Sequence, residues 1–350
     1  MRIFTFFTLL LLALPAFAAD PSPAPAVQKI WDQGPHNAFT DLIRFQDRWW
    51  CTFREATAHV GGNGKSRVLE STDGREWKPA ALVAEEGIDL RDPKLSLTPD
   101  GRLMMVMGGS IYEGKTLKGR QPRVSFSSDG RSWSAPKKVL EPNEWLWRVT
   151  WHDGVCYGLS YNAAARSEPA AKDAAATGKV PPGPAEWKLK LVSSKDGENY
   201  ETITHLDVPG HPNESTIRFL PDGRMAALIR REGGDQQGWV GTSKAPYKEW
   251  TFHPVGQRLG GPNFVVLPDG RLIAATRKYK PTVQTILAAL DAETGKLTEL
   301  LTLPSGGDTS YAGLVVHGDK LWVSYYSSHE KKSSIYMTSV GLDDLKTSKE

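Results

Sequence analysis

The chain contains few of the features that support disulfide or metal chemistry. Only two of its 350 residues are cysteines. Cys51 and Cys156 each lie within an apolar segment, so we expect buried free thiols rather than a disulfide framework. The sequence has no HExxH, CxxC or P-loop motif, and its eight histidines are dispersed. It therefore predicts no cofactor and no transition-metal site.

Long runs of one charge and long apolar runs are also scarce. The 43 basic and 40 acidic residues are mixed along the chain, so we expect no nucleic-acid partner. The main apolar run, residues 3–14, follows Arg2 and precedes the small-residue segment Ala-Phe-Ala. This pattern is typical of a signal peptide at residues 1–18, and the run is too short to span a bilayer. With a Pro/Ala linker at 19–26, the sequence predicts a secreted or periplasmic protein that is monomeric and not membrane-bound.

Turns between apolar segments are abundant. Asp-Gly or a related pair lies between strand-forming residues at six places about 50 residues apart, namely 44–50, 97–105, 150–158, 219–227, 266–274 and 315–323. Each is a β-hairpin signal. The third unit contains a polar Ala/Pro/Gly-rich insertion at 162–186. Four short strands in each of six units predict an all-β fold, a six-bladed β-propeller over residues 27–345.

The two ends of this region complement each other. Residues 309–340 contain three apparent strands, and residues 27–35 offer a fourth. We therefore expect the N-terminal strand to close the last blade, which removes exposed sheet edges.

A second turn motif, Ser-x-Asp-Gly-x-x-aromatic, recurs at 71–77, 127–133 and 194–200. The aspartate side chain accepts hydrogen bonds from nearby backbone N–H groups, and glycine tolerates a positive φ. The motif therefore predicts a tight turn without chemistry of its own.

These motifs resemble the Asp boxes of the sialidase superfamily, and the resemblance extends from about residue 27 to the end. Residues 211–231, "HPNESTIRFLPDGRMAALIRR", are similar to the sialidase segment that carries a catalytic glutamate and a clamp arginine. The resemblance implies Glu214 as the base and Arg230 as a clamp. It also implies Arg277 as a second clamp and Tyr311 as the nucleophile.

The chemistry of these residue types agrees with such a site. A tyrosine needs a neighbouring carboxylate to attack at neutral pH, and guanidinium groups bind carboxylates through paired hydrogen bonds. Because inner propeller strands line the channel, Glu214, Asn263 and Tyr311 are expected to converge at one mouth.

Two sialidase features are missing. His36 and Asn37 stand where the first clamp arginine is expected. The segment 53–69, "FREATAHVGGNGKSRVL", lacks the usual aspartate acid/base. It offers Arg54, Glu55 and His59 instead, and the next inner strand begins with Arg91 and Asp92. His59 or Asp92 could carry the proton, with Asp41 as a further candidate if its pKa were raised.

The sequence thus predicts an exported, sialidase-like glycoside hydrolase acting on an acidic or unusual sugar at a glycan end. Tyr311, Glu214, His59 and Asp92 are its predicted catalytic residues. Its predicted substrate contacts are His36, Arg54, Glu55, Arg91, Arg230, Asn263 and Arg277. A polysaccharide lyase using His59 and Tyr311 on a uronic acid, and a non-catalytic glycan-binding propeller, are the two alternatives.

Overall fold

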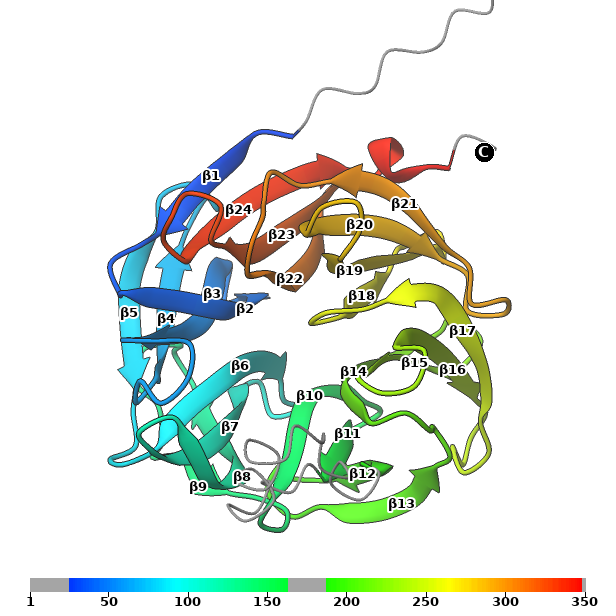
Figure 1. Cartoon of the computed structure of the whole chain (residues 1–350), viewed down its shortest axis with the longest axis horizontal. Helices are drawn as coiled ribbons and strands as arrows, with labels where there is room; N and C mark the ends of the chain where they lie inside the picture. Colours follow the sequence, from blue (N-terminus) through cyan, green and yellow to red (C-terminus); the bar gives the residue numbers. More distant parts are fainter. Residues whose placement is uncertain (1–24, 163–186, 348–350) are drawn as a thin grey trace, which may run out of the picture.

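The computed structural model consists of six four-stranded antiparallel sheets arranged around a central axis (Figure 1). It describes residues 25–162 and 187–347. The predicted six-bladed β-propeller is therefore confirmed. Within the described ranges, no helix is long and apolar enough to cross a membrane. The predicted signal peptide, most of the linker and nearly all of the 162–186 insertion lie outside the described residues.

The strands follow one another from the inner to the outer edge of each blade. Blade 1 contains β2 (His36–Phe45), β3 (Arg48–Ala56), β4 (Lys65–Ser71) and β5 (Lys78–Val83). Blade 2 contains β6 (Asp89–Leu97), β7 (Leu103–Glu113), β8 (Thr116–Ser127) and β9 (Lys137–Lys138). Blade 3 contains β10 (Glu144–His152), β11 (Val155–Asn162), β12 (Leu189–Ser194) and β13 (Glu201–Leu206).

The second half repeats this order. Blade 4 contains β14 (Pro212–Phe219), β15 (Met225–Arg231), β16 (Gln237–Ser243) and β17 (Thr251–Arg258). Blade 5 contains β18 (Asn263–Val266), β19 (Leu272–Lys278), β20 (Gln284–Leu290) and β21 (Leu297–Thr302). Blade 6 contains β22 (Thr309–His317), β23 (Lys320–Ser327), β24 (Ser334–Gly341) and β1 (Val27–Trp31), and a 3-10 turn, η1 (Asp343–Leu345), follows it.

Blade 6 is shared between the two ends of the chain. β1 pairs antiparallel with β24, and Val27 lies opposite Thr338 (Figure 1). The predicted closure by the N-terminal strand is therefore confirmed, and it covers an edge that would otherwise expose unpaired backbone groups.

The inner strands β2, β6, β10, β14 and β22 each change register at a similar point near their N-terminal ends. Such bulges re-aim side chains and are frequent beside active sites. Asp92 and Tyr311 lie within two of these irregular stretches, with φ values of 50° and 55°. The backbone therefore directs a set of side chains to one level of the channel.

The Ser-x-Asp-Gly-x-x-aromatic turns join β4 to β5, β8 to β9 and β12 to β13, at the outer part of three blades. In blade 2, Asp129 Oδ1 accepts the amides of Arg131 and Ser132 at 2.8 and 2.7 Å. Gly130 has a φ of 75°, and a Cβ there would lie 2.4 Å from the Trp50 ring of blade 1. The predicted tight turn is therefore present, and its glycine packs against the neighbouring blade. Both cysteines are buried free thiols.

We expect Asp129→Ala to lower the free energy of unfolding by about 1–2 kcal/mol, because two backbone donors lose their acceptor. Denaturant unfolding measures this loss. Glu76→Ala, at an exposed position of the equivalent turn in blade 1, is the control and should leave stability unchanged. A loss of ligand binding or turnover in Asp129→Ala without loss of stability would contradict a purely structural role.

Candidate active site

Tyr311, Glu214 and Arg230 form a hydrogen-bonded cluster at the mouth of the channel. The Tyr311 hydroxyl donates to Glu214 Oε1 at 2.7 Å, the contact that the sequence analysis expected. Arg230 Nη1 donates to the Tyr311 oxygen at 3.0 Å and to the other Glu214 oxygen. Tyr311 and Glu214 are 7% and 9% exposed, so they lie almost entirely out of water while retaining a small accessible surface.

The environment of Tyr311 keeps its hydroxyl protonated in the free protein. Burial raises the pKa of the phenol well above its usual value, and the charge of Glu214 raises it further, against the opposing effect of Arg230 and Arg277. A reaction at the phenol oxygen therefore needs a base in contact with its proton. Glu214 Oε1 occupies that position.

Arg230 and Arg277 lie on the same side of the channel, around Tyr311. Arg277 Cζ is 5.8 Å from the centroid of the Tyr311 ring. Each guanidinium already has a carboxylate partner besides this contact: Arg230 Nη2 contacts Glu232, and Arg277 Nη2 donates to Asp308 Oδ1 at 2.9 Å. The two arginines are thus close enough to act on one ligand, but their charges are balanced within the protein.

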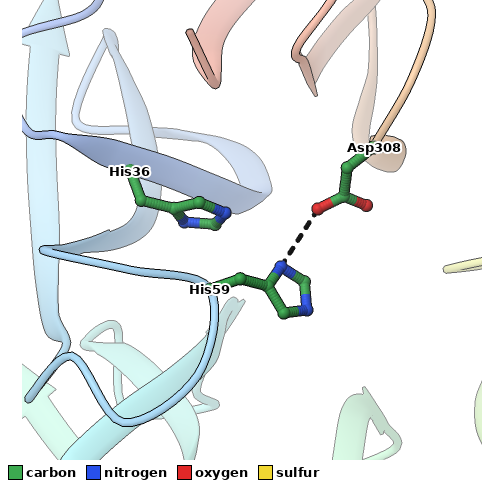
Figure 2. Close-up of side chains that lie close together, drawn as sticks. All are labelled: His36, His59 and Asp308. Atoms are coloured by element: carbon green, nitrogen blue, oxygen red, sulfur yellow. Dashed lines mark ion pairs between the residues drawn. The ribbon is translucent and has the colours of Figure 1, made fainter.

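His59 and Asp308 form a second polar pair at this mouth (Figure 2). His59 Nδ1 lies 3.1 Å from Asp308 Oδ2, and the His59 side chain is 48% exposed. Asp308 also accepts the hydroxyl of Tyr326 at 2.7 Å. The ring of His36 lies 5.2 Å from that of His59. Burial, together with the positive charges of His59 and Arg54, lowers the pKa of His36 to about 4, so this imidazole is neutral at pH 7.

Arg54 and Arg91 hold the loop that carries His59. Arg54 is fully buried; it donates to both oxygens of Asp89 at 2.7 and 2.9 Å and to the carbonyl of Ala58 at 2.8 Å. Arg91 donates to the carbonyl of His59 at 2.8 Å. The expectation that Arg54 contacts substrate is therefore wrong, because no part of it is accessible. Arg54 and Arg91 both position His59.

Asp92 is buried close to the charges of Arg91, Lys94 and Glu214. Its side chain is 7% exposed, and its Oδ1 has no hydrogen-bond partner among the described residues. Burial raises the pKa of Asp92 to about 6, against the opposing charges of Arg91 and Lys94. Asp92 is therefore a carboxyl group that changes charge close to neutral pH.

Three other expected residues do not join the cluster. Glu55 points to the opposite face of β3 from Arg54, where it accepts Arg67 at 3.0 Å and the Trp31 indole at 3.0 Å. The amide of Asn263 is engaged by the carbonyl of Ala312 and by Arg218, both at 2.9 Å. Asp41 accepts Arg148 and the amide of Leu95. These contacts hold the three side chains within the fold, and the substrate roles of Glu55 and Asn263 and the proton-carrier role of Asp41 stay predictions.

Several residues that complete the site were not among the predicted site residues. Asp308, Tyr326, Trp147, Tyr161 and Lys94 all lie near Tyr311, His59 or Glu214. Trp147 packs edge-on against Tyr311 with 5.3 Å between ring centroids. Asp308 precedes Tyr311 by only three residues, and that proximity was the one available signal. The others depend on which way an irregular strand turns its side chains.

Comparisons with known proteins support the fold. No protein-family model matches the chain, and no curated protein matches it. A protein of unknown function from Dyadobacter fermentans superposes with a TM-score of 0.76 at 20% identity, over 91% of this chain and 99% of that one. An α-L-arabinanase from Penicillium chrysogenum, solved with arabinobiose, gives 0.69 at 15% identity, over 92% and 99%. The NanB sialidase from Streptococcus pneumoniae gives 0.65 at 9% identity, over 93% and 71%.

At these identities the similarity establishes a shared six-bladed propeller and nothing finer. The predicted resemblance to sialidases is confirmed at the level of fold. An arabinan-degrading propeller is as similar in structure as a sialidase. The choice of substrate therefore depends on the residues at the mouth.

We expect Asp92→Asn to stabilise the protein increasingly as pH rises. A raised pKa means that neutral Asp92 contributes stability fully below the usual aspartate pKa near 4, and this contribution is lost as pH rises through about 6. Asparagine stays neutral and tolerates a positive φ. The unfolding free energy of the variant, relative to the native protein, should therefore increase by roughly 1–3 kcal/mol between pH 4 and pH 8.

Chemical denaturation at several pH values measures this difference. Asp153→Asn is the control, since Asp153 also has a positive φ but its side chain is 89% exposed. A variant that loses stability relative to the native protein as pH rises would show that Asp92 is instead stabilised as a carboxylate.

Proposed function

We propose that this protein is an exported glycoside hydrolase that removes a terminal sugar, with Tyr311 as the nucleophile and Glu214 as its base. The 2.7 Å hydrogen bond from the Tyr311 hydroxyl to Glu214 Oε1 is the observation that carries the proposal. The depth of Tyr311 supports exo action, because a chain end reaches a nearly buried hydroxyl more readily than the middle of a chain does.

The proposed reaction has two steps. In the first, the Tyr311 oxygen bonds to the anomeric carbon, its proton passes to Glu214, and the glycosidic bond breaks. The departing oxygen takes a proton from the protonated His59 ring. In the second, neutral His59 takes a proton from water, the water oxygen replaces Tyr311 at the anomeric carbon, and Glu214 returns its proton. Two displacements retain the configuration of the sugar.

His59 is the better candidate for the proton carrier. Its loop is the one in which the sialidase-like pattern lacks an aspartate, and its ring is half exposed at the mouth. With Asp308 accepting the Nδ1 proton at 3.1 Å, Nε2 is left for proton transfer to and from substrate. Asp92 is buried near Lys94 and Glu214. In this scheme it interacts electrostatically with Glu214 and does not transfer a proton to the departing group.

The charges around Tyr311 favour an uncharged sugar. Arg230 and Arg277 are paired with Glu232 and Asp308. A sugar carboxylate would have to compete with those two groups, and His36 supplies no permanent charge where the first clamp arginine was expected. We therefore infer a neutral terminal sugar, and the earlier expectation of an acidic glycan becomes the contrasting arm of the assay.

A panel of neutral and sialic-acid glycosides tests this proposal. We expect release of a neutral sugar and retention of its configuration. Tyr311→Phe should lower turnover on that substrate by about 10³-fold or more, and Glu214→Gln similarly, with little further loss in the double variant because the two groups act together. Tyr325→Phe removes another buried hydroxyl, which donates to the carbonyl of Pro304, and should keep normal turnover.

Other outcomes would identify the alternatives. An unsaturated uronate product, seen by its ultraviolet absorbance, would make the protein a lyase. Saturable binding without product would make it a glycan-binding propeller. Faster cleavage of sialosides would overturn the neutral-sugar inference and leave the Tyr311–Glu214 assignment standing. Near-normal turnover in Tyr311→Phe would overturn the mechanism itself.

His59→Gln should lower the rate of hydrolysis by a factor that depends on the leaving group of the glycoside. Without a proton donor, glycosides with poor leaving groups should slow by about 10²–10⁴-fold, whereas activated aryl glycosides need little protonation and should slow far less. Steady-state rates across a series of aryl glycosides measure this trend. Equal losses on all members of the series would assign His59 to binding or positioning instead.

A further inference from the structure

Three potential metal ligands from distant parts of the sequence meet at the channel mouth. His36 begins β2, His59 lies in the loop after β3, and Asp308 precedes β22 (Figure 2). One donor atom from each lies within 4.8 Å of the other two. The dispersed histidines of the sequence predicted no transition-metal site. The closed ring overturns that reason, since it places residues 36 and 308 beside each other.

We propose that His36, His59 and Asp308 bind a divalent transition-metal ion such as Zn²⁺, each residue donating one ligand atom, with a further coordination position open at the mouth. Two imidazole nitrogens and one carboxylate oxygen suit zinc and its neighbours in the first transition series. Calcium and magnesium prefer oxygen ligands alone, so the same site should discriminate against them.

The spacing of the donors agrees with this assignment. Zinc–ligand bonds of about 2.0–2.2 Å place neighbouring ligand atoms roughly 3.3–3.5 Å apart in a tetrahedral site. His59 Nδ1 and Asp308 Oδ2 are 3.1 Å apart. The widest of the three separations, up to 4.8 Å, has to close by up to about 1.3–1.5 Å to reach the spacing of a tetrahedral site.

His36 is available as a ligand. Its Nδ1 is buried and has no hydrogen-bond partner among the residues that the structure describes. A neutral imidazole ring has one nitrogen lone pair that can coordinate a metal ion. In Figure 2 the other ring nitrogen, Nε2, lies on the side of His59 and Asp308, so Nε2 is the His36 donor atom at the site.

The surrounding residues orient the ligands as they do in established metal sites. Asp308 Oδ1 accepts Arg277 at 2.9 Å and Tyr326 at 2.7 Å, which leaves Oδ2 toward His59. Arg91 holds the carbonyl of His59 at 2.8 Å. Such second contacts fix ligand orientation and contribute strongly to metal affinity.

Calorimetric titration of the full, untagged and chelator-treated protein with zinc chloride tests the site. We expect one zinc ion per chain and no comparable binding of calcium chloride. His36→Gln and His59→Gln should each weaken zinc binding by more than about tenfold. His152→Gln is the matched control, since His152 also lies beside a carboxylate, with Nε2 3.4 Å from Asp153, and it should bind zinc normally.

Thermal melting without zinc identifies variants that fail to fold. His59→Gln is expected to fold because its side chain is half exposed, so the test does not depend on the more buried His36. Absence of stoichiometric zinc binding, or unchanged affinity in a folded His59→Gln, would overturn the site.

The effect of zinc on hydrolysis tests the metal site and the proposed function separately. An ion on His59 Nδ1 and Asp308 would remove the proton carrier, so hydrolysis should fall as the site fills. Zinc binding that leaves hydrolysis unchanged would support the metal site and refute His59 as the proton carrier.

Discussion

The pairing of β1 with β24 is the constraint on which the candidate site depends. It joins the two ends of the chain in blade 6, and that blade packs against blade 1. At this junction Thr40 donates to the carbonyl of Tyr311 at 2.9 Å, and Asn37 donates to the carbonyl of Ser333 at the same distance. Tyr311 and Asp308 come from one side of the junction, and His36 and His59 from the other. An open ring would leave these groups on separate edges.

Within the closed ring, the irregular register of the inner strands places the reactive groups. A regular strand would send neighbouring side chains to opposite faces. The bulges instead turn Phe39, Asp92 and Tyr311 to positive φ, at 66°, 50° and 55°. For residues other than glycine, such backbone conformations cost of order 1–3 kcal/mol each and persist only where the surrounding structure enforces them. Their concentration at one level of one channel supports a functional reason for the strain.

The six blades could be predicted from the sequence because short local segments determine where each strand begins and ends. Six hairpin turns and the spacing between them determine the strand count, and the resemblance of two segments to sialidases pointed to Glu214 and Tyr311. The contacts of Arg54, Glu55 and Asn263 were not predictable in this way. Arg54 and Glu55 are adjacent, yet one is buried against Asp89 and the other faces Trp31. Which neighbour faces the channel depends on strand direction and register, and both are set by residues far away in the chain.

The titratable groups of the site lie in two environments, one buried and one exposed to solvent, which a hydrolase would use for different proton transfers. Beneath Tyr311, Lys94 is 2% exposed and donates to the carbonyls of Phe39 and Thr40, with its nitrogen 4.7 Å from the centroid of the Trp147 ring. Glu214 and Asp92 share this buried layer, where charges interact strongly. His59 and Asp308 lie above it, in contact with solvent. A base that must hold one proton during attack belongs in the buried layer, because water there would compete with the phenol. A group that exchanges protons with a departing oxygen and then with water belongs at the surface, where His59 lies.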